Sequence, residues 1–155
     1  MAKGVTGLDS LERKLRRLPK LMTDEIRRAM EAVADDIVRM MKSLVAVDNG
    51  DLQKTIGWTW GEAPKGSLTV AKIAPKNIGV GLELTIFAGN SEIYWGRWIE
   101  FGIAPHTNGG LFAGSKHPGT AAQPFFFVSY RANKKGAKAA IRKAIRSSAK
   151  KVAAS

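Results

Sequence analysis

The strongest constraint on the fold is a stretch near the N-terminus in which apolar residues recur every three or four positions. It covers residues 22–44, and charged side chains fill most of the intervening positions. Because an α-helix has about 3.6 residues per turn, this spacing places the apolar side chains on one face. The pattern therefore predicts an amphipathic helix of about six turns that packs in the core. Its apolar positions are Met22, Ile26, Ala29, Met30, Val33, Ile37, Met40, Met41 and Leu44.

A shorter helix is expected upstream of it, over residues 9–18. Asp9 can cap its start, and Glu12 stands at the third helical position, where it can complete a capping box. Pro19 has no backbone N–H, so we expect it to end this helix or to open the next one. The apolar stripe of the short helix would consist of Leu8, Leu11, Leu15 and Leu18.

The middle of the chain favours β-structure. Asn49-Gly50 between two aspartates predicts a turn, with Gly50 free to take a positive φ. Candidate strands follow at residues 55–62, 67–73 and 78–88, joined by short connections that favour antiparallel pairing. Helices before and after a block of strands indicate an α+β fold. We expect the long N-terminal helix and a C-terminal helix to pack on an antiparallel sheet of about three to four strands.

The last third of the chain divides into three parts. A short helix, capped by Asn90 or Ser91, is expected to run through Tyr94, Trp95 and Trp98 to Phe101. Residues 102–123 have no periodicity and contain five glycines, two prolines and both histidines, which predicts a mobile loop with a functional role. Residues 124–155 predict a basic helix that begins at Pro124. We expect residues 1–155 to form a single domain.

Composition and motifs argue against an enzyme, a cofactor site and a metal centre. The sequence has no cysteine, which excludes disulfides and thiolate zinc ligands. His106 and His117 lie in a Gly-rich segment without a further ligand at metal-site spacing. There is no P-loop and no nucleophile elbow. No stretch reaches the roughly 18 apolar residues of a membrane span, and no apolar region follows Lys3 as in a secretion signal. We expect a protein that acts by binding, without catalytic or cofactor-binding residues and without a membrane partner.

Positive charge is concentrated at the C-terminus. The chain has a net charge of +12, of which +9 lies in residues 124–155, where there is no acidic residue. A local basic block predicts contact with the phosphate backbone of a nucleic acid, without recognition of its base sequence. A solvated helix end would have the same composition. The candidate DNA-proximal residues are Arg131, Lys134, Lys135, Lys138, Arg142, Lys143, Arg146, Lys150 and Lys151.

Three ordered segments resemble a known family. Residues 42–56 resemble the pattern K-S-L-V-P-V-D-T-G-D-L-x-x-S-I, residues 94–102 resemble Y-A-x-x-V-E-F-G-T, and residues 122–127 resemble A-x-P-F-L-R-P-A. With the Leu-Glu-x-x-Leu start at Leu11, the set is similar to the tail-component family of long-tailed double-stranded DNA bacteriophages, which includes neck, tail-completion and head–tail joining proteins. The likeness runs from about residue 7 to residue 145. This chain departs from the patterns at Ala46, Asn49 and Ile103, where the family usually has proline, threonine and threonine.

The resemblance implies a structural virion protein of the head–tail joint. Such a subunit would assemble into a ring, with sixfold symmetry expected and twelvefold open, and act in tail completion or tail termination. Its partners would be other copies of itself, the connector or stopper and tail-tube proteins, and double-stranded DNA that passes through the channel without sequence-specific contacts. It would reside in the virion, and in the host cytoplasm during assembly. The expected protein-interface residues are Asp48, Asn49, Gly50, Asp51, Trp95, Trp98, Glu100, Phe101, His106, Phe112, His117 and Phe125.

Two other functions stay open on the sequence alone. The basic C-terminal helix could instead make the protein a free, non-sequence-specific nucleic-acid-binding protein. A small hydrolase with an unrecognised site is the third reading, although the sequence nominates no convergent polar cluster for it.

Overall fold

The computed structural model describes residues 8–73 and 82–154, with side chains from residue 20 onward except at residues 70–72. The fold is α+β, with long helices at both ends of the chain, as the sequence predicts. The elements in chain order are α1 (Leu8–Leu44), α2 (Asp51–Thr55), β1 (Gly57–Trp60), β2 (Leu68–Ile73), β3 (Leu84–Ala88), α3 (Gly96–Phe101), β4 (His106–Thr107), the 3-10 turn η1 (Gly110–Phe112), β5 (Lys116–His117) and α4 (Phe126–Ala154).

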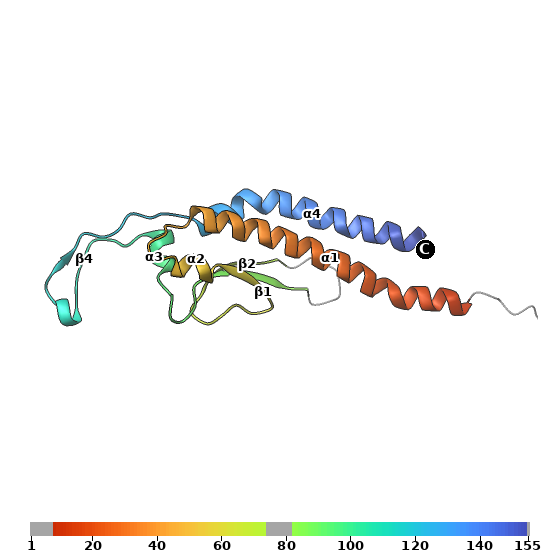
Figure 1. Ribbon diagram of the computed structural model, residues 1–155, viewed down its shortest axis with the longest axis horizontal. Coiled ribbons are helices and arrows are strands. Elements are labelled where there is room, and N and C mark those ends of the chain that lie inside the picture. Colours follow the sequence, from red (N-terminus) through yellow and green to blue (C-terminus); the bar gives the residue numbers. More distant parts are fainter. Residues whose placement is uncertain (1–7, 74–81, 155) are drawn as a thin grey trace, which may run out of the picture.

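The two long helices α1 and α4 run antiparallel and lie side by side along an elongated body (Figure 1). The three-stranded sheet lies against them, with α1 as its main neighbour. The core forms where the apolar stripe of α1 meets the sheet and the start of α4, so the predicted amphipathic helix is confirmed. Leu44 is the exception in that stripe, because its side chain is exposed. The fully buried large side chains include Ile26, Met30, Ile37, Met41, Leu84, Ile86, Phe125 and Phe126.

The sheet has the strand order β1-β3-β2, and both pairings are antiparallel. Trp58 lies opposite Ile86 in the register of β1 and β3. Leu82, Leu84 and Ile86 are all buried, as expected of alternate residues on one face of a strand. The strands are shorter than the predicted ranges, and residues 78–81 of the third strand lie outside the described residues.

Two tryptophans of β1 tie the sheet to α1. The indole N–H of Trp58 donates to Asp35 at 2.7 Å, and that of Trp60 donates to Glu31 at 3.1 Å. The two acceptors are four residues apart on α1, so they share the face that the strand meets. The guanidinium of Arg27 lies 4.7 Å from the centre of the Trp60 ring, in a cation–π contact. These residues fix the sheet on the helix and are part of the fold.

The expected break at Pro19 is wrong, because α1 is one continuous helix from Leu8 to Leu44. A proline inside a helix removes one backbone hydrogen bond and costs about 3 kcal/mol. Long amphipathic helices offset such a cost by packing on the rest of the fold, which the local sequence does not reveal. The leucine stripe expected over residues 9–18 lies outside the described side chains.

The segment after α1 also differs from expectation. Gly50 has a φ of 80°, as predicted for the turn, but residues 51–55 form the short helix α2 instead of leading directly into a strand. The amide oxygen of Asn49 accepts the backbone N–H of Asp51 at 3.0 Å, and Leu52 is buried. Burying Leu52 while the Asn49 side chain holds the turn favours a helical turn over extended backbone. Strand pairing therefore begins at Gly57.

The short helix near residue 95 begins later than expected. The side chain of Asn90 accepts the N–H groups of Glu92 at 2.9 Å and Ile93 at 2.8 Å, which makes a turn and does not cap a helix. The helix itself, α3, starts at Gly96. Among the described residues, no helix combines the length and apolar character needed to cross a membrane.

Candidate assembly site

Residues 102–123 form a projecting β-hairpin, here called the arm. In Figure 1 it extends from one end of the body, and the C-terminus lies at the other end. At its root the backbones of Ile103 and Thr120 exchange two hydrogen bonds, at 2.9 and 2.8 Å. Farther out, His106 pairs with His117 and Thr107 pairs with Lys116. The segment predicted as a loop thus contains two short paired strands, and its mobility stays a prediction.

The root of the arm depends on glycine. Gly102 has a φ of 73°, and a Cβ there would lie 2.6 Å from the carbonyl oxygen of Thr120. Gly119 has a φ of 83°, and a Cβ there would lie 2.5 Å from the carbonyl oxygen of Ile103. Both the backbone conformation and the close approach exclude a side chain at these positions. The two backbone segments at the arm root can come this close only because both residues are glycines.

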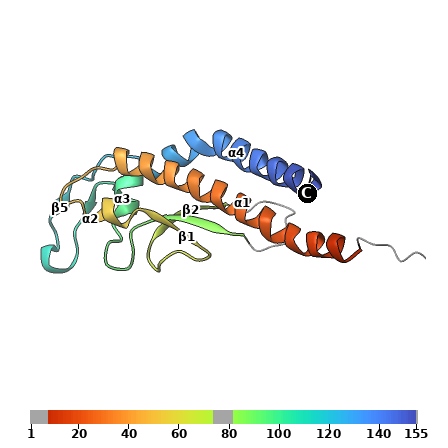
Figure 2. The ribbon, with the colours of Figure 1, turned by 45° about the vertical axis from the view of Figure 1, so that its right-hand side comes forward.

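The tip of the arm presents apolar side chains. Leu111 is 99% exposed and Phe112 is 73% exposed. The backbone N–H of Asn108 donates to the carbonyl of Ser115 at 2.8 Å, and the two side chains form a second hydrogen bond at 2.9 Å. These bonds close the hairpin just below the tip, so its backbone is held while its apolar side chains are largely exposed to solvent. Figure 2 shows the same arm turned by 45°.

The two histidines stack across the hairpin. Their ring centres are 4.9 Å apart and the planes differ by 18°. The backbone N–H of Gly119 donates to Nδ1 of His117 at 3.0 Å, which places the proton of that neutral ring on Nε2. A ring in this tautomer has no free nitrogen lone pair for a metal. Within the described part of the chain, no three histidine, cysteine or acidic residues group as metal ligands.

A buried carboxylate joins the arm root to the start of α4. Glu100 is 4% exposed, and its side chain accepts the backbone N–H groups of Phe125 at 2.8 Å, Phe126 at 2.9 Å and Phe127 at 3.0 Å. The first N–H groups of a helix have no partner within the helix, and the positive end of the helix dipole favours a negative group. Glu100 therefore caps α4 from a different helix, α3.

Two of the expected interface residues take part in this cap. Glu100 and Phe125 are buried within the protomer, and their part in a protein interface stays a prediction. The cap was not predicted from the sequence, although the residues before α4 carry a signal for it. The residues before α4, Ala122-Gln123-Pro124, offer none of the preferred Ser, Thr, Asp or Asn caps, so a distant acceptor was required.

Exposed aromatic residues lie beside the arm root. Tyr94 contacts Trp98 edge-to-face with ring centres 5.4 Å apart, and both side chains are about half exposed or more. Phe101 is also exposed and contacts Phe127 with ring centres 5.7 Å apart. Trp95, by contrast, is half-buried and packs against the core. An exposed aromatic group of this kind is typical of a protein-binding surface.

The sequence of this chain matches one family of known proteins. The family described as "Bacteriophage HK97-gp10, putative tail-component" matches residues 9–102, which is more than half of the 155 residues. The chain belongs to this family. No curated protein and no solved structure matches the chain. The match covers α1, the sheet and α3, and it ends where the arm begins. The tail-component family therefore accounts for the body, and the arm and α4 follow the matched segment.

The turn after α1 lies within the matched segment of this tail component. Asp48 and Asn49 are exposed, and Gly50 and Asp51 are half-buried. Asp51 accepts hydrogen bonds from the side chains of Asn49 at 2.7 Å and Lys54 at 3.4 Å, so it is engaged within the turn. This leaves Asp48 as the acidic group of the turn that points to solvent without a hydrogen-bond partner among the described residues.

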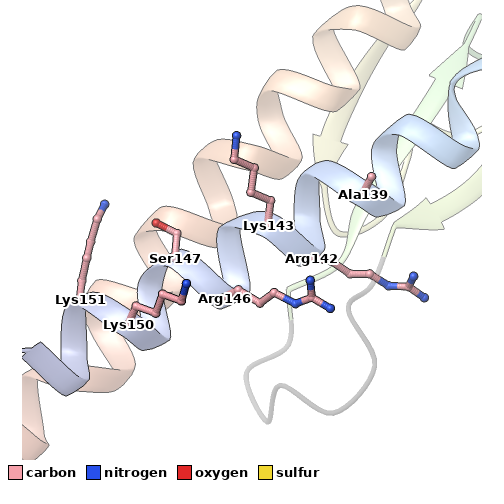
Figure 3. A pocket seen from close by; sticks show the side chains of 7 residues that line it. All are labelled: Ala139, Arg142, Lys143, Arg146, Ser147, Lys150 and Lys151. Atoms are coloured by element: carbon pink, nitrogen blue, oxygen red, sulfur yellow. The ribbon is translucent and has the colours of Figure 1, made fainter.

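The basic residues of α4 lie on its outer side. Ile141, Ala144 and Ser148 are buried toward α1, and all nine predicted basic residues are exposed. Arg142, Arg146 and Lys150 follow at intervals of four residues, which is about 6 Å per step along a helix. Figure 3 shows them around a shallow depression of about 650 Å³, and the other residues that line it are Ala139, Lys143, Ser147 and Lys151.

One of these cations is paired within the protein. The ammonium of Lys151 lies 3.2 Å from the carboxylate of Glu25, which links the end of α4 to α1. A hydrogen bond from the Ser147 side chain, followed by the hydrogen bond and charge of Lys151, holds the pKa of Glu25 below its ordinary value. Lys134 lies 5.9 Å from the centre of the Tyr130 ring. Arg142, Arg146 and Lys150 have no ion pair among the described residues.

Proposed function

We propose that this tail component is a ring subunit of the head–tail joint, acting in tail completion or termination around the DNA channel. The observation that carries the proposal is the division of the molecule into two ends. One end holds an arm with an exposed apolar tip and exposed aromatic residues, and the other holds a basic helix face. A ring subunit around DNA needs both, because it must bind protein neighbours and tolerate a polyanion.

The apolar end supports protein contacts. Large exposed apolar side chains on a small monomer usually mark a binding surface. Of those among the described residues, Leu21, Leu44 and Val47 lie in or just after α1, and the other five lie on or beside the arm: Tyr94, Trp98, Phe101, Leu111 and Phe112. A contact between unlike surfaces of identical subunits closes into a ring when the rotation is right. We propose six copies, to match a sixfold tail, with neck or connector proteins on one side and the tail tube on the other.

The test is assembly of the purified protein. Native mass spectrometry should detect a closed ring, and the protein should restore head–tail joining when it is added to phage particles that lack it. A protein that stays monomeric with connector and tail-tube proteins, and that fails to join heads to tails, would contradict the proposal. We also propose that it acts without catalysis, and measured turnover of any substrate would contradict that part.

A second candidate is free, non-sequence-specific nucleic-acid binding, which the row of Arg142, Arg146 and Lys150 favours. Binding of this kind weakens with salt, with a slope of about 0.9 per phosphate contact in a plot of log K against log salt. Replacing all three residues by alanine should then reduce the slope by about 3. The matched control replaces Lys20, Lys54 and Lys65, which removes the same charge from exposed positions elsewhere.

The two candidates separate in moderate salt. A joint protein should bind bare DNA weakly on its own and still form rings or bind its protein partners. A free DNA-binding protein should hold bare DNA tightly without forming rings. Equal losses in the triple variant and in the control would show that net charge alone, and not this row, sets the affinity.

A further inference from the structure

Hydrogen bonds hold the backbone of the arm tip, although its apolar side chains are exposed to solvent. Leu111 and Phe112 lie in the 3-10 turn η1, which the Asn108–Ser115 hydrogen bonds close from below. The hydroxyl of Ser115 also donates to the carbonyl of Phe112 at 2.7 Å. Two large apolar side chains at the exposed end of a hydrogen-bonded hairpin are typical of a binding surface. The tip is therefore suited to contact with another apolar surface.

A second exposed apolar surface lies at the end of α1. Leu44 and Val47 are both exposed, Val47 to 58%. Asp48 follows directly and is also exposed. We call Leu44, Val47 and Asp48 the collar. The side chain of Gln53 holds this region by donating to the carbonyl of Lys42 at 2.8 Å. The collar is thus a fixed apolar surface with a carboxylate at its edge.

The charges of the two surfaces are complementary. The arm, residues 102–123, contains Lys116 and the two histidines and no acidic residue. Lys116 is exposed and has no ion pair among the described residues, and the same holds for Asp48 of the collar. A tip that meets a collar brings this ammonium toward this carboxylate. Two tips that meet each other would instead bring like charges together, which disfavours a symmetric tip-to-tip contact.

We propose that the arm tip of one copy docks on the collar of the next copy. In the structure the tip does not touch the collar of its own chain, because Leu111 is almost fully exposed. A contact between two different surfaces of identical chains is heterologous, so it propagates from copy to copy and closes into a ring when the rotation between copies is right. This inference rests on the proposed ring function and names the surfaces that would build the ring.

Cysteine cross-linking tests the contact, because the natural sequence has no cysteine. In the double variant Leu111→Cys with Val47→Cys, mild oxidation should give a ladder of disulfide-linked species that ends at the ring size. Each single variant should stay uncross-linked, and a mixture of the two should stop at dimers. A control double variant, Leu111→Cys with Ala149→Cys, moves the second thiol to an exposed site near the end of α4 and should give no ladder.

Charge exchange tests the same contact without cross-linking. Lys116→Glu and Asp48→Lys should each lower the association constant of one tip–collar contact by up to roughly fivefold, as expected for one exposed ion pair. The ring fraction should fall with it, and the double variant should recover it. Both sites are exposed, so circular dichroism should show folded protein in every case.

The outcomes separate this inference from the function on which it rests. Rings in native mass spectrometry without a tip–collar ladder would overturn the inference and leave the proposed function intact. Dimers from Leu111→Cys alone would show tip-to-tip contact and overturn it. A ladder obtained with Trp98→Cys in place of Val47→Cys would move the docking surface to the aromatic residues and would also overturn it. Monomers under all conditions would count against both proposals.

Discussion

The arm end and the basic end of this protein are built in different ways. The arm keeps its form through backbone hydrogen bonds and two glycines, and nearly all its side chains face solvent. The far half of α4 keeps its form through side chains buried against α1 and leaves its basic face to solvent. Backbone geometry therefore controls one end and side-chain packing controls the other. Substitutions should affect the two ends separately, except where Glu100 joins them.

The largest expected effect is at Glu100, because it caps α4 from the arm side. Glu100→Ala leaves two buried N–H groups and one partly buried N–H group without an acceptor and should lower the free energy of unfolding by about 3 kcal/mol. Glu100→Gln keeps one acceptor oxygen and should lose about half of that. Urea denaturation followed by circular dichroism measures both. Equal stability of Glu100→Ala and the natural protein would show that the ends are not joined here.

The next effect is confined to the basic end. Ile141 is 9% exposed and packs in the core, so Ile141→Ala should cost about 2 kcal/mol through lost contacts and a small cavity. The exposed neighbour Ala140 offers a matched control, because Ala140→Ser should change stability by less than about 0.5 kcal/mol. Hydrogen exchange should increase in α4 and stay unchanged in the arm. Faster exchange at residues 103–120 would contradict the separation.

A somewhat smaller effect is confined to the arm. Gly102→Ala places a Cβ against the carbonyl of Thr120 at a positive φ and should cost about 1.5 kcal/mol. Gly109 has a negative φ and open space around it, so Gly109→Ala is the matched control and should be nearly neutral. Limited proteolysis should cut the arm faster in the first variant only. If both variants resist equally, the arm root does not require glycine.

The sequence predicted the body of the fold better than it predicted the arm. The three- and four-residue spacing of Ile26, Met30, Val33 and Ile37 dictates a helix whatever surrounds it, because only that conformation gathers these side chains. The alternation of Leu82, Leu84 and Ile86 dictates a strand face in the same way. Local sequence patterns are sufficient to predict an element whose buried side chains recur at regular spacing.

The candidate site was less predictable because its geometry depends on distant residues. Nothing local in Glu100 shows that it caps a helix that starts 26 residues later. The arm looked irregular because Gly102 and Gly119 hide the strand signal, and the pairing that orders it spans the whole segment. A residue pattern read over one turn or one strand does not contain such contacts.

The smallest expected effect on stability is also at the basic end, at the ion pair between Lys151 and Glu25. The pKa of Glu25 is lowered from its ordinary value of 4.5, so the pair stabilises the protein above that pH and this contribution disappears as pH falls through the lowered pKa. Glu25→Gln should therefore be slightly less stable than the natural protein near pH 7, and the difference should vanish well below pH 4.5. Because Lys151 is exposed, high salt should reduce the part of the difference that comes from its charge. Thermal unfolding at both pH values measures it, and a difference that persists in strong acid would show that Glu25 acts through packing and not through charge.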